Sequence, residues 1–176
     1  WDRRYGFMNK ALTSPISRSS IALGKMSAIS LISALQASLI VGIALAIGVT
    51  FPNPFMIVPI MAIVILFSMG FSGISVIVAA TAKSQETFWG VINFLGMPLF
   101  MLSPALFPLE LLPDWLATIA KLNPVTYTVL LVREMMTGVS EGGISALLSI
   151  GVIAVFVLVM VGLASYVFTR EVNKPF

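Results

Sequence analysis

The sequence lacks cysteine and histidine altogether, and it is poor in charged residues of either sign. Without cysteine there can be no disulfide or thiolate nucleophile, and without histidine no imidazole metal ligand or general base. Charged residues make up 10% of the chain, whereas a soluble domain contains about 25%. Because 59% of the 176 residues are hydrophobic, the composition predicts an integral membrane protein.

Four hydrophobic stretches are long enough to cross a bilayer, since a spanning helix needs about 20 apolar residues. They are residues 26–51, 55–82, 87–106 and 144–168. We therefore expect an all-α integral membrane fold with four transmembrane helices, which form a single transmembrane domain over residues 1–176.

The basic residues predict the orientation of these helices, because Lys and Arg gather on the cytoplasmic side of a membrane. If residues 1–25 are cytoplasmic, only Lys121 and Arg133 of the ten Lys and Arg lie outside. An even number of spans then returns the tail, residues 169–176, to the cytoplasm. The net charge of +3 is interpreted as this topology signal and not as affinity for nucleic acid.

The segment of residues 1–25 carries the densest positive charge of the chain. Trp1, Tyr5, Met8 and Leu12 recur at steps of four, three and four, so they would share one face of a helix. Pro15 disfavours helix at the preceding residue and predicts its end. An amphipathic cytoplasmic helix of this kind either lies on anionic lipid or docks onto a protein partner, and its composition allows both.

The outer segment, residues 107–143, predicts two short helices rather than a plain loop. The first starts in the Pro-Asp-Trp run at 113–115 and stops at Asn123. Asn123 followed by Pro124 is typical of an N-cap with Pro at the first helical position, and Gly138 is typical of a C-terminus. The second helix would be about 20 Å long, which is too short to span, so we expect a re-entrant pair dipping into the outer leaflet.

Four side chains of this outer segment have predicted locations. Trp115 and Tyr127 are expected at the membrane interface, where amphipathic rings are favoured. Arg133 and the adjacent Glu134 do not face each other on a helix. They are therefore interpreted as solvated or interfacial and not as a catalytic pair.

The first span carries a ridge of small residues, each four positions apart: Ser30, Ala34, Ser38, Gly42 and Ala46. Such a ridge lets another helix approach closely, because helix association in lipid depends on packing. A packing seam within this subunit is the favoured interpretation, and a subunit interface is the alternative.

A few side chains inside the spans are candidates for lining a transport pathway: Gln36, Asn93, Met97 and Met101. For Gln36, an interhelical hydrogen bond is favoured over substrate contact. The Met residues suit promiscuous contact, although such a stripe is more often core or lipid-facing. Pro98 predicts a kink, because it removes one backbone hydrogen bond.

The four spans contain no Asp, Glu, Lys or Arg, although ion-coupled transporters commonly place ionisable groups there. The catalytic groups that intramembrane proteases need are also missing from the spans, so we expect that this chain is not an enzyme. Energy for uphill transport would have to come from a partner, which suggests an ATP-driven one. A non-transporting assembly or scaffold component would lack the same groups and is the alternative.

Three ordered motifs resemble the permeases of type-2 ATP-binding cassette (ABC) exporters. The first is WDRRYGF at 1–7 with LTSPISR at 12–18 and LGK at 23–25. The second is MPLFMLS at 97–103 with ALFPL at 105–109, and the third is LPDWL at 112–116 with LNPVTY at 122–127 and Arg133. The resemblance covers essentially the whole chain.

The resemblance implies an exporter in a prokaryotic plasma membrane, built from two permease subunits and two ATPase subunits surrounded by lipid. The ATP and magnesium would sit on the ATPase, leaving this chain without a cofactor, and the substrate would be a drug, lipid or lipid-linked glycan. The chain would be a fragment lacking an N-terminal interfacial helix and two spans. Arg4 departs from a frequently acidic position of the family, and Pro104 from a usual Gly.

The resemblance also assigns residues to roles. The coupling helix that docks into the ATPase would contain Asp2, Arg3, Arg4, Tyr5, Gly6, Phe7, Met8 and Leu12. The re-entrant region closing the outer side would contain Pro108, Pro113, Trp115, Asn123, Pro124, Tyr127 and Arg133.

Overall fold

The computed structural model describes residues 17–49, 53–140 and 142–172, and this part of the chain is helical without a strand. The elements are α2 (Arg18–Ala46), η1 (Pro54–Met56), α3 (Ile57–Thr81), α4 (Gln85–Met101), η2 (Leu109–Leu111), α5 (Asp114–Lys121), α6 (Pro124–Thr137) and α7 (Ala146–Val172). The predicted all-α class is confirmed for these residues. The predicted coupling helix falls in residues 1–14, outside the described residues.

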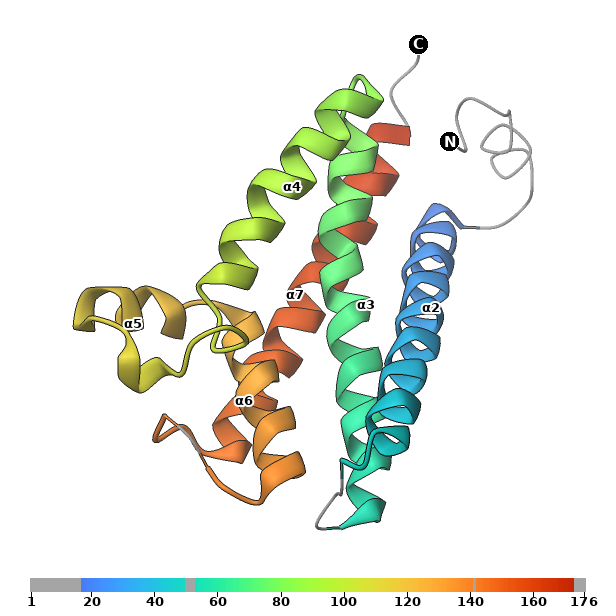
Figure 1. Ribbon diagram of the computed structural model, residues 1–176. Helices are drawn as coiled ribbons and strands as arrows, with labels where there is room; N and C mark the ends of the chain where they lie inside the picture. The colour runs from blue at the N-terminus through green and yellow to red at the C-terminus, as the bar shows by residue number, and fades with distance from the viewer. Residues whose placement is uncertain (1–16, 50–52, 141, 173–176) are drawn as a thin grey trace.

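The long helices α2, α3 and α7 run side by side, and α4 lies on the other side of α3 from α2 (Figure 1). Helix α3 is central, because it packs against α2, α4, α6 and α7. The start of α2 and the end of α7 lie at the same end of the bundle, and the short helices α5 and α6 lie towards the opposite end (Figure 1).

Three helical segments of the described chain are long and apolar enough to cross a membrane: Ser19–Ala46, Pro54–Thr81 and Ala146–Glu171. A fourth is reached if α5 and α6, which meet at 90°, count as one bent span. Helix α4 has 17 residues and is therefore about 25 Å long. It ends at Met101, before the end of the predicted span 87–106, and it continues through Pro98.

Helix α2 ends at Ala46 because of a glycine that the length argument overlooked. Gly48 has a φ of 92°, in the left-handed region that favours glycine. The Val49 N–H donates to the Ala44 carbonyl at 2.9 Å, and the Gly48 N–H to the Leu45 carbonyl at 3.1 Å. These are the two bonds of a Schellman motif, which stops the helix before the predicted boundary at residue 51.

Helices α3 and α7 approach each other closely at two glycines of α3. A Cβ atom on Gly70 would lie 2.9 Å from Val157 Cγ2 and 3.0 Å from Val157 Cα. A Cβ atom on Gly73 would lie 3.0 Å from the Met160 carbonyl oxygen. Small residues allow such backbone contact between membrane helices, where association depends on packing.

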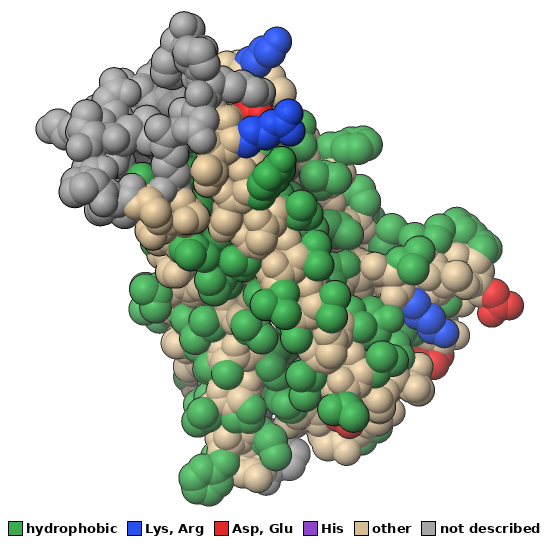
Figure 2. All heavy atoms as spheres, turned by 180° about the vertical axis from the view of Figure 1, so that it is seen from behind, with side chains coloured by type: hydrophobic (Ala, Val, Ile, Leu, Met, Phe, Trp, Pro, Cys, Tyr) green, Lys and Arg blue, Asp and Glu red, His purple; other side chains and the backbone are tan. Residues whose placement is uncertain are grey.

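Buried side chains form three clusters around this pair of helices. Near the start of α2 lie Ala22, Met26, Val76, Ala80, Ala164 and Phe168. Where α6 meets α7 lie Leu131, Ile153 and Val157, and beneath the turn between α5 and α6 lie Leu109, Ala120, Leu130 and Ile144. Elsewhere the helices present large apolar side chains outward, and Figure 2 shows many of them along the length of the bundle.

Candidate functional site

The candidate site is the turn between α5 and α6, residues 120–127, which we call the elbow. Three of its polar groups bind the carbonyls at the end of α5. Thr126 Oγ1 donates to the Ala120 carbonyl at 2.7 Å, and Tyr127 Oη to the Lys121 carbonyl at 2.7 Å. The Asn123 N–H also reaches the Ala120 carbonyl, at 3.1 Å. The 90° bend is therefore held by bonds to carbonyls that a helix end leaves without helical partners.

Asn123 makes two further bonds through its side chain, which is buried. Its Oδ1 accepts from the Val125 N–H at 3.0 Å, which caps α6 as predicted. Its Nδ2 donates to the Leu99 carbonyl of α4 at 2.6 Å. One amide thus starts α6 and also contacts α4.

Arg133 makes a second link between α6 and the chain that follows α4. Its Nη2 donates to the Pro104 carbonyl at 2.9 Å, and the side chain is half-buried. The interpretation of Arg133 as a solvated or interfacial residue is therefore incomplete. Its guanidinium makes a charge-assisted bond to a carbonyl that is close in space but 29 positions away in the sequence.

The segment preceding α7 is tied to the same region. The Gly142 N–H donates to Glu110 Oε1 at 2.8 Å. Around this bond lies a polar hollow of about 360 Å³, which Asp114 and Lys121 also line. Three charged side chains of the outer segment, Glu110, Asp114 and Lys121, therefore gather beside α5.

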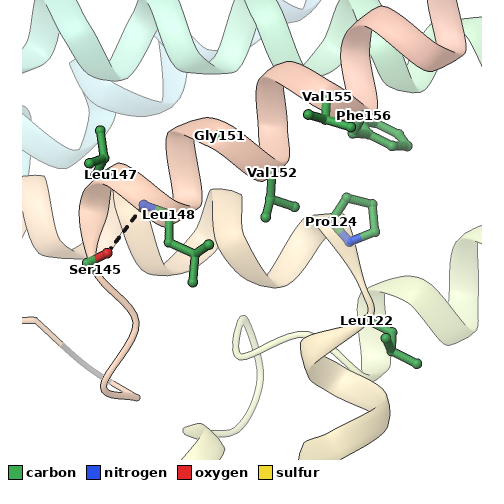
Figure 3. A pocket seen from close by; sticks show the side chains of 9 residues that line it. All are labelled: Leu122, Pro124, Ser145, Leu147, Leu148, Gly151, Val152, Val155 and Phe156. Atoms are coloured by element: carbon green, nitrogen blue, oxygen red, sulfur yellow. Dashed lines mark hydrogen bonds between the residues drawn. The ribbon is translucent and has the colours of Figure 1, made fainter.

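An apolar hollow of about 690 Å³ lies between the elbow and the first half of α7. Leu122 and Pro124 line it from the elbow, and Leu148, Val152 and Phe156 from α7 (Figure 3). At its edge the Leu148 N–H donates to Ser145 Oγ, the dashed bond in Figure 3. The lining can accept apolar chains but offers few polar groups.

The structure gathers only part of the predicted re-entrant set at the elbow. Asn123, Pro124 and Tyr127 belong to the elbow itself, and Arg133 follows on α6. Trp115 lies near the start of α5 with 66% of its surface exposed. The remaining two prolines precede short helices, with Pro108 before η2 and Pro113 before α5. Tyr127 is half-buried, and its ring packs against the apolar clusters beneath the elbow.

The predicted pathway residues do not lie together within this chain. Asn93, Met97 and Met101 are exposed along one face of α4. Gln36 is exposed on α2, on the other side of α3 (Figure 1). No described residue makes the hydrogen bond to Gln36 that the sequence favoured.

The ridge of small residues on α2 is used at one end only. Ser30 is buried and Ala34 is half-buried, whereas Ser38, Gly42 and Ala46 are exposed. A Cβ atom on Gly42 would meet nothing within 4 Å. The seam inside this subunit instead begins with Ala22 and Met26, which precede the ridge.

Sequence reasoning overlooked three contributors to the site: Thr126, Ser103 and the carbonyl of Leu99. Thr126 has no exposed surface, and Ser103 has 1%. A Thr three residues after an N-cap Asn, in reach of the preceding helix end, was the available signal for Thr126. Backbone carbonyls carry no such signal, because every residue has one.

The comparisons with known proteins agree with this architecture. The model of a protein family described as "ABC-2 type transporter" matches residues 1–137. Proteins described as the transport permease ycf38 are similar: that of Cyanophora paradoxa is 32% identical over 130 residues, and that of Pyropia yezoensis 30% identical over 141. These matches cover 73% and 80% of this chain.

The matched parts amount to 45% and 48% of those two relatives, so the chain spans about half their length. No solved structure matches the chain. The helices that are able to span a membrane, the absence of charged residues from the hydrophobic stretches and the family match lead to one conclusion. This chain belongs to the ABC-2 type transporter family.

Proposed function

We propose that this chain is the permease subunit of an ATP-driven exporter in the plasma membrane, and that it moves an amphipathic substrate outward. The family match over residues 1–137 carries the proposal. It is supported by the four hydrophobic stretches, which contain no Asp, Glu, Lys or Arg, the groups that ion-coupled transporters commonly place there. The energy then comes from ABC ATPase subunits, which bind ATP and magnesium.

The proposed topology has four spans, with α4 as the third, and both ends of the chain in the cytoplasm. Lys83, between α3 and α4, and Arg170, near the end of α7, then lie on the cytoplasmic side with residues 1–25. The elbow lies in the outer leaflet as part of a re-entrant pair. Single cysteines at positions 14 and 118 test this arrangement, since the chain has no native cysteine. They should react from opposite sides of the membrane, and reaction from the same side would contradict the topology.

Energy enters, in this proposal, through a coupling helix at residues 1–14 that docks onto the ATPase. Its apolar face would carry Met8 and Leu12, so replacing each by Asp should abolish docking while the chain still inserts. Co-purification with the ATPase measures this, and replacement of Asn9 on the opposite face by Asp is the matched control. Unchanged co-purification of the Met8→Asp, Leu12→Asp variant would contradict the docking role.

Two such permeases and two ATPases form the proposed exporter, and the substrate is a drug, a lipid or a lipid-linked glycan. The apolar hollow beside the elbow supports an amphipathic substrate class, because its lining is almost entirely aliphatic and aromatic. ATPase activity in liposomes should rise with the transported compound. If no ATPase co-purifies and ATP hydrolysis has no effect on any candidate, the scaffold alternative is favoured.

A further inference from the structure

Helix α4 is the least embedded long helix of the described chain. None of its residues is buried, and its packing is mainly against α3, where it is much sparser than that of α2 or α7. Phe94 and Met97 of α4 have 78% and 68% of their surfaces exposed. Packing along its length therefore does little to fix its position relative to the other helices.

The burial of the chain increases abruptly where α4 ends. Ser103 has 1% of its surface exposed, and Pro104 is also fully buried. The Ser103 N–H donates to the Phe100 carbonyl at 3.2 Å, and Ser103 Oγ to the same oxygen at 2.7 Å. The chain therefore leaves the helix in a tight turn that is held in the protein interior.

This turn leaves two carbonyls to be bound from outside the helix. In a continuing helix the Leu99 carbonyl would accept from the N–H of Ser103, but that N–H points to Phe100 instead. Asn123 supplies the missing donor at 2.6 Å, and Arg133 supplies one for the Pro104 carbonyl at 2.9 Å. We call these two bonds the clasp.

We infer that Asn123 and Arg133 are positioning residues whose clasp makes the end of α4 and the elbow move as one unit. The two bonds join the weakly packed α4 to α6, which packs firmly against α7. Because Asn123 also caps α6, any rotation of that helix start is passed to the carbonyl of Leu99. The position of the outer end of α4, and of the exposed face bearing Met97 and Met101, then follows the elbow.

Spin-label distances test the clasp without a substrate or an ATPase, so its failure is separate from that of the proposed function. Spin labels are attached to cysteines that replace Phe94 on α4 and Leu122 in the elbow. Both native side chains are exposed, and the chain has no native cysteine. The full chain in lipid nanodiscs should give one narrow distance. A control pair at Leu35 on α2 and Leu158 on α7 reports on the bundle.

Each of two variants removes the clasp bond of one residue and leaves a side chain that can fill part of the same space. Asn123→Ser keeps an N-cap hydroxyl for α6 but lacks the donor for Leu99. Arg133→Met keeps an aliphatic stem but lacks the donor for Pro104. Each should raise the population of a second, longer distance about tenfold, which is the shift expected for a lost hydrogen bond of this strength.

Arg133→Lys is the conservative partner, because it keeps a charged donor on a long side chain; it should retain the narrow distance as the main one. Unchanged distances in both Asn123→Ser and Arg133→Met would overturn the inference. So would a broadening in Arg133→Lys equal to that in Arg133→Met, because packing rather than the bond would then be responsible. Equal broadening of the control pair would overturn it as well, since the bonds would then hold the whole bundle.

Discussion

The hydroxyl of Thr126 lies 2.7 Å from the carbonyl oxygen of Ala120, and neither residue has any exposed surface. This buried bond crosses the elbow, joining the first turn of α6 to the end of α5. The Asn123 N–H binds the same carbonyl at 3.1 Å. This doubly bound carbonyl, together with the Lys121 carbonyl that Tyr127 binds, holds the direction of the chain at the 90° bend.

Replacing Thr126 by Val should destabilise the fold by about 1 kcal/mol, the net value of one intramolecular hydrogen bond. The cost should not be larger, because Asn123 still satisfies the Ala120 carbonyl. Thermal unfolding in detergent measures the change. Thr128→Val is the matched control, since Thr128 only binds back to Pro124 within its own helix at 3.3 Å. Equal losses in both variants would contradict a special role for Thr126.

Replacing Gly73 by Ala should destabilise the contact between α3 and α7 by about 1–3 kcal/mol, the usual cost of overpacking. The added Cβ would lie 3.0 Å from the Met160 carbonyl oxygen, and backbone atoms cannot turn aside as a side chain can. Unfolding temperatures give the measurement. Gly162→Ala on α7 has open space around its Cβ, so it should be neutral or stabilising by up to about 1 kcal/mol.

Gly138 ends α6 with a φ of 74°, as the sequence predicted for a C-terminal glycine. Gly138→Ala should cost about 1–2 kcal/mol from the left-handed backbone alone, because its Cβ would meet nothing within 4 Å. Gly138→Asn should cost less, since Asn tolerates this conformation. Chemical unfolding of the two variants compares them, and an equal cost for Ala and Asn would argue against the backbone explanation.

Ser84 caps the start of α4, where its Oγ accepts from the Thr87 N–H at 3.1 Å. Ser84→Ala should reduce helix stability by about 1 kcal/mol, whereas Ser84→Asp should keep the cap. Because α4 has no buried residue, the loss should concentrate in its first turn. Hydrogen exchange of the α4 amides would show it as faster exchange, and protection equal to wild type in Ser84→Ala would contradict the expectation.

The sequence predicted those parts of the fold that depend on local signals. Asn123 followed by Pro124 marked the start of α6, and Gly138 marked its end; both are confirmed. The hydrophobic stretches located α2, α3 and α7, because length and composition alone distinguish a helix that can cross a membrane. Gly48 ends α2, but the hydrophobic stretch continues past it to residue 51, so the predicted end of this helix lay too far along the chain.

The elbow and its clasp could not be predicted in the same way. Arg133 and Asn123 bind carbonyls far along the chain, and carbonyls of Leu99 and Pro104 look like any others in a sequence. The face on which the small residues of α2 would pack was also undetermined. A ridge at four-residue steps drifts around a helix of 3.6 residues per turn, so only its beginning, at Ser30 and Ala34, is buried or half-buried.

Gly70 and Gly73 bring the backbone of α3 into close contact with α7. The backbones of α3 and α7 lie so close here that a side chain does not fit between them, so these two helices should stay packed together. Helix α4 packs much more sparsely against α3 than α2 or α7 does, and the two bonds of the clasp hold only its C-terminal end. Rearrangement of the helices should therefore displace α4 more readily than it separates α3 from α7, because the two glycines keep those two helices in close backbone contact.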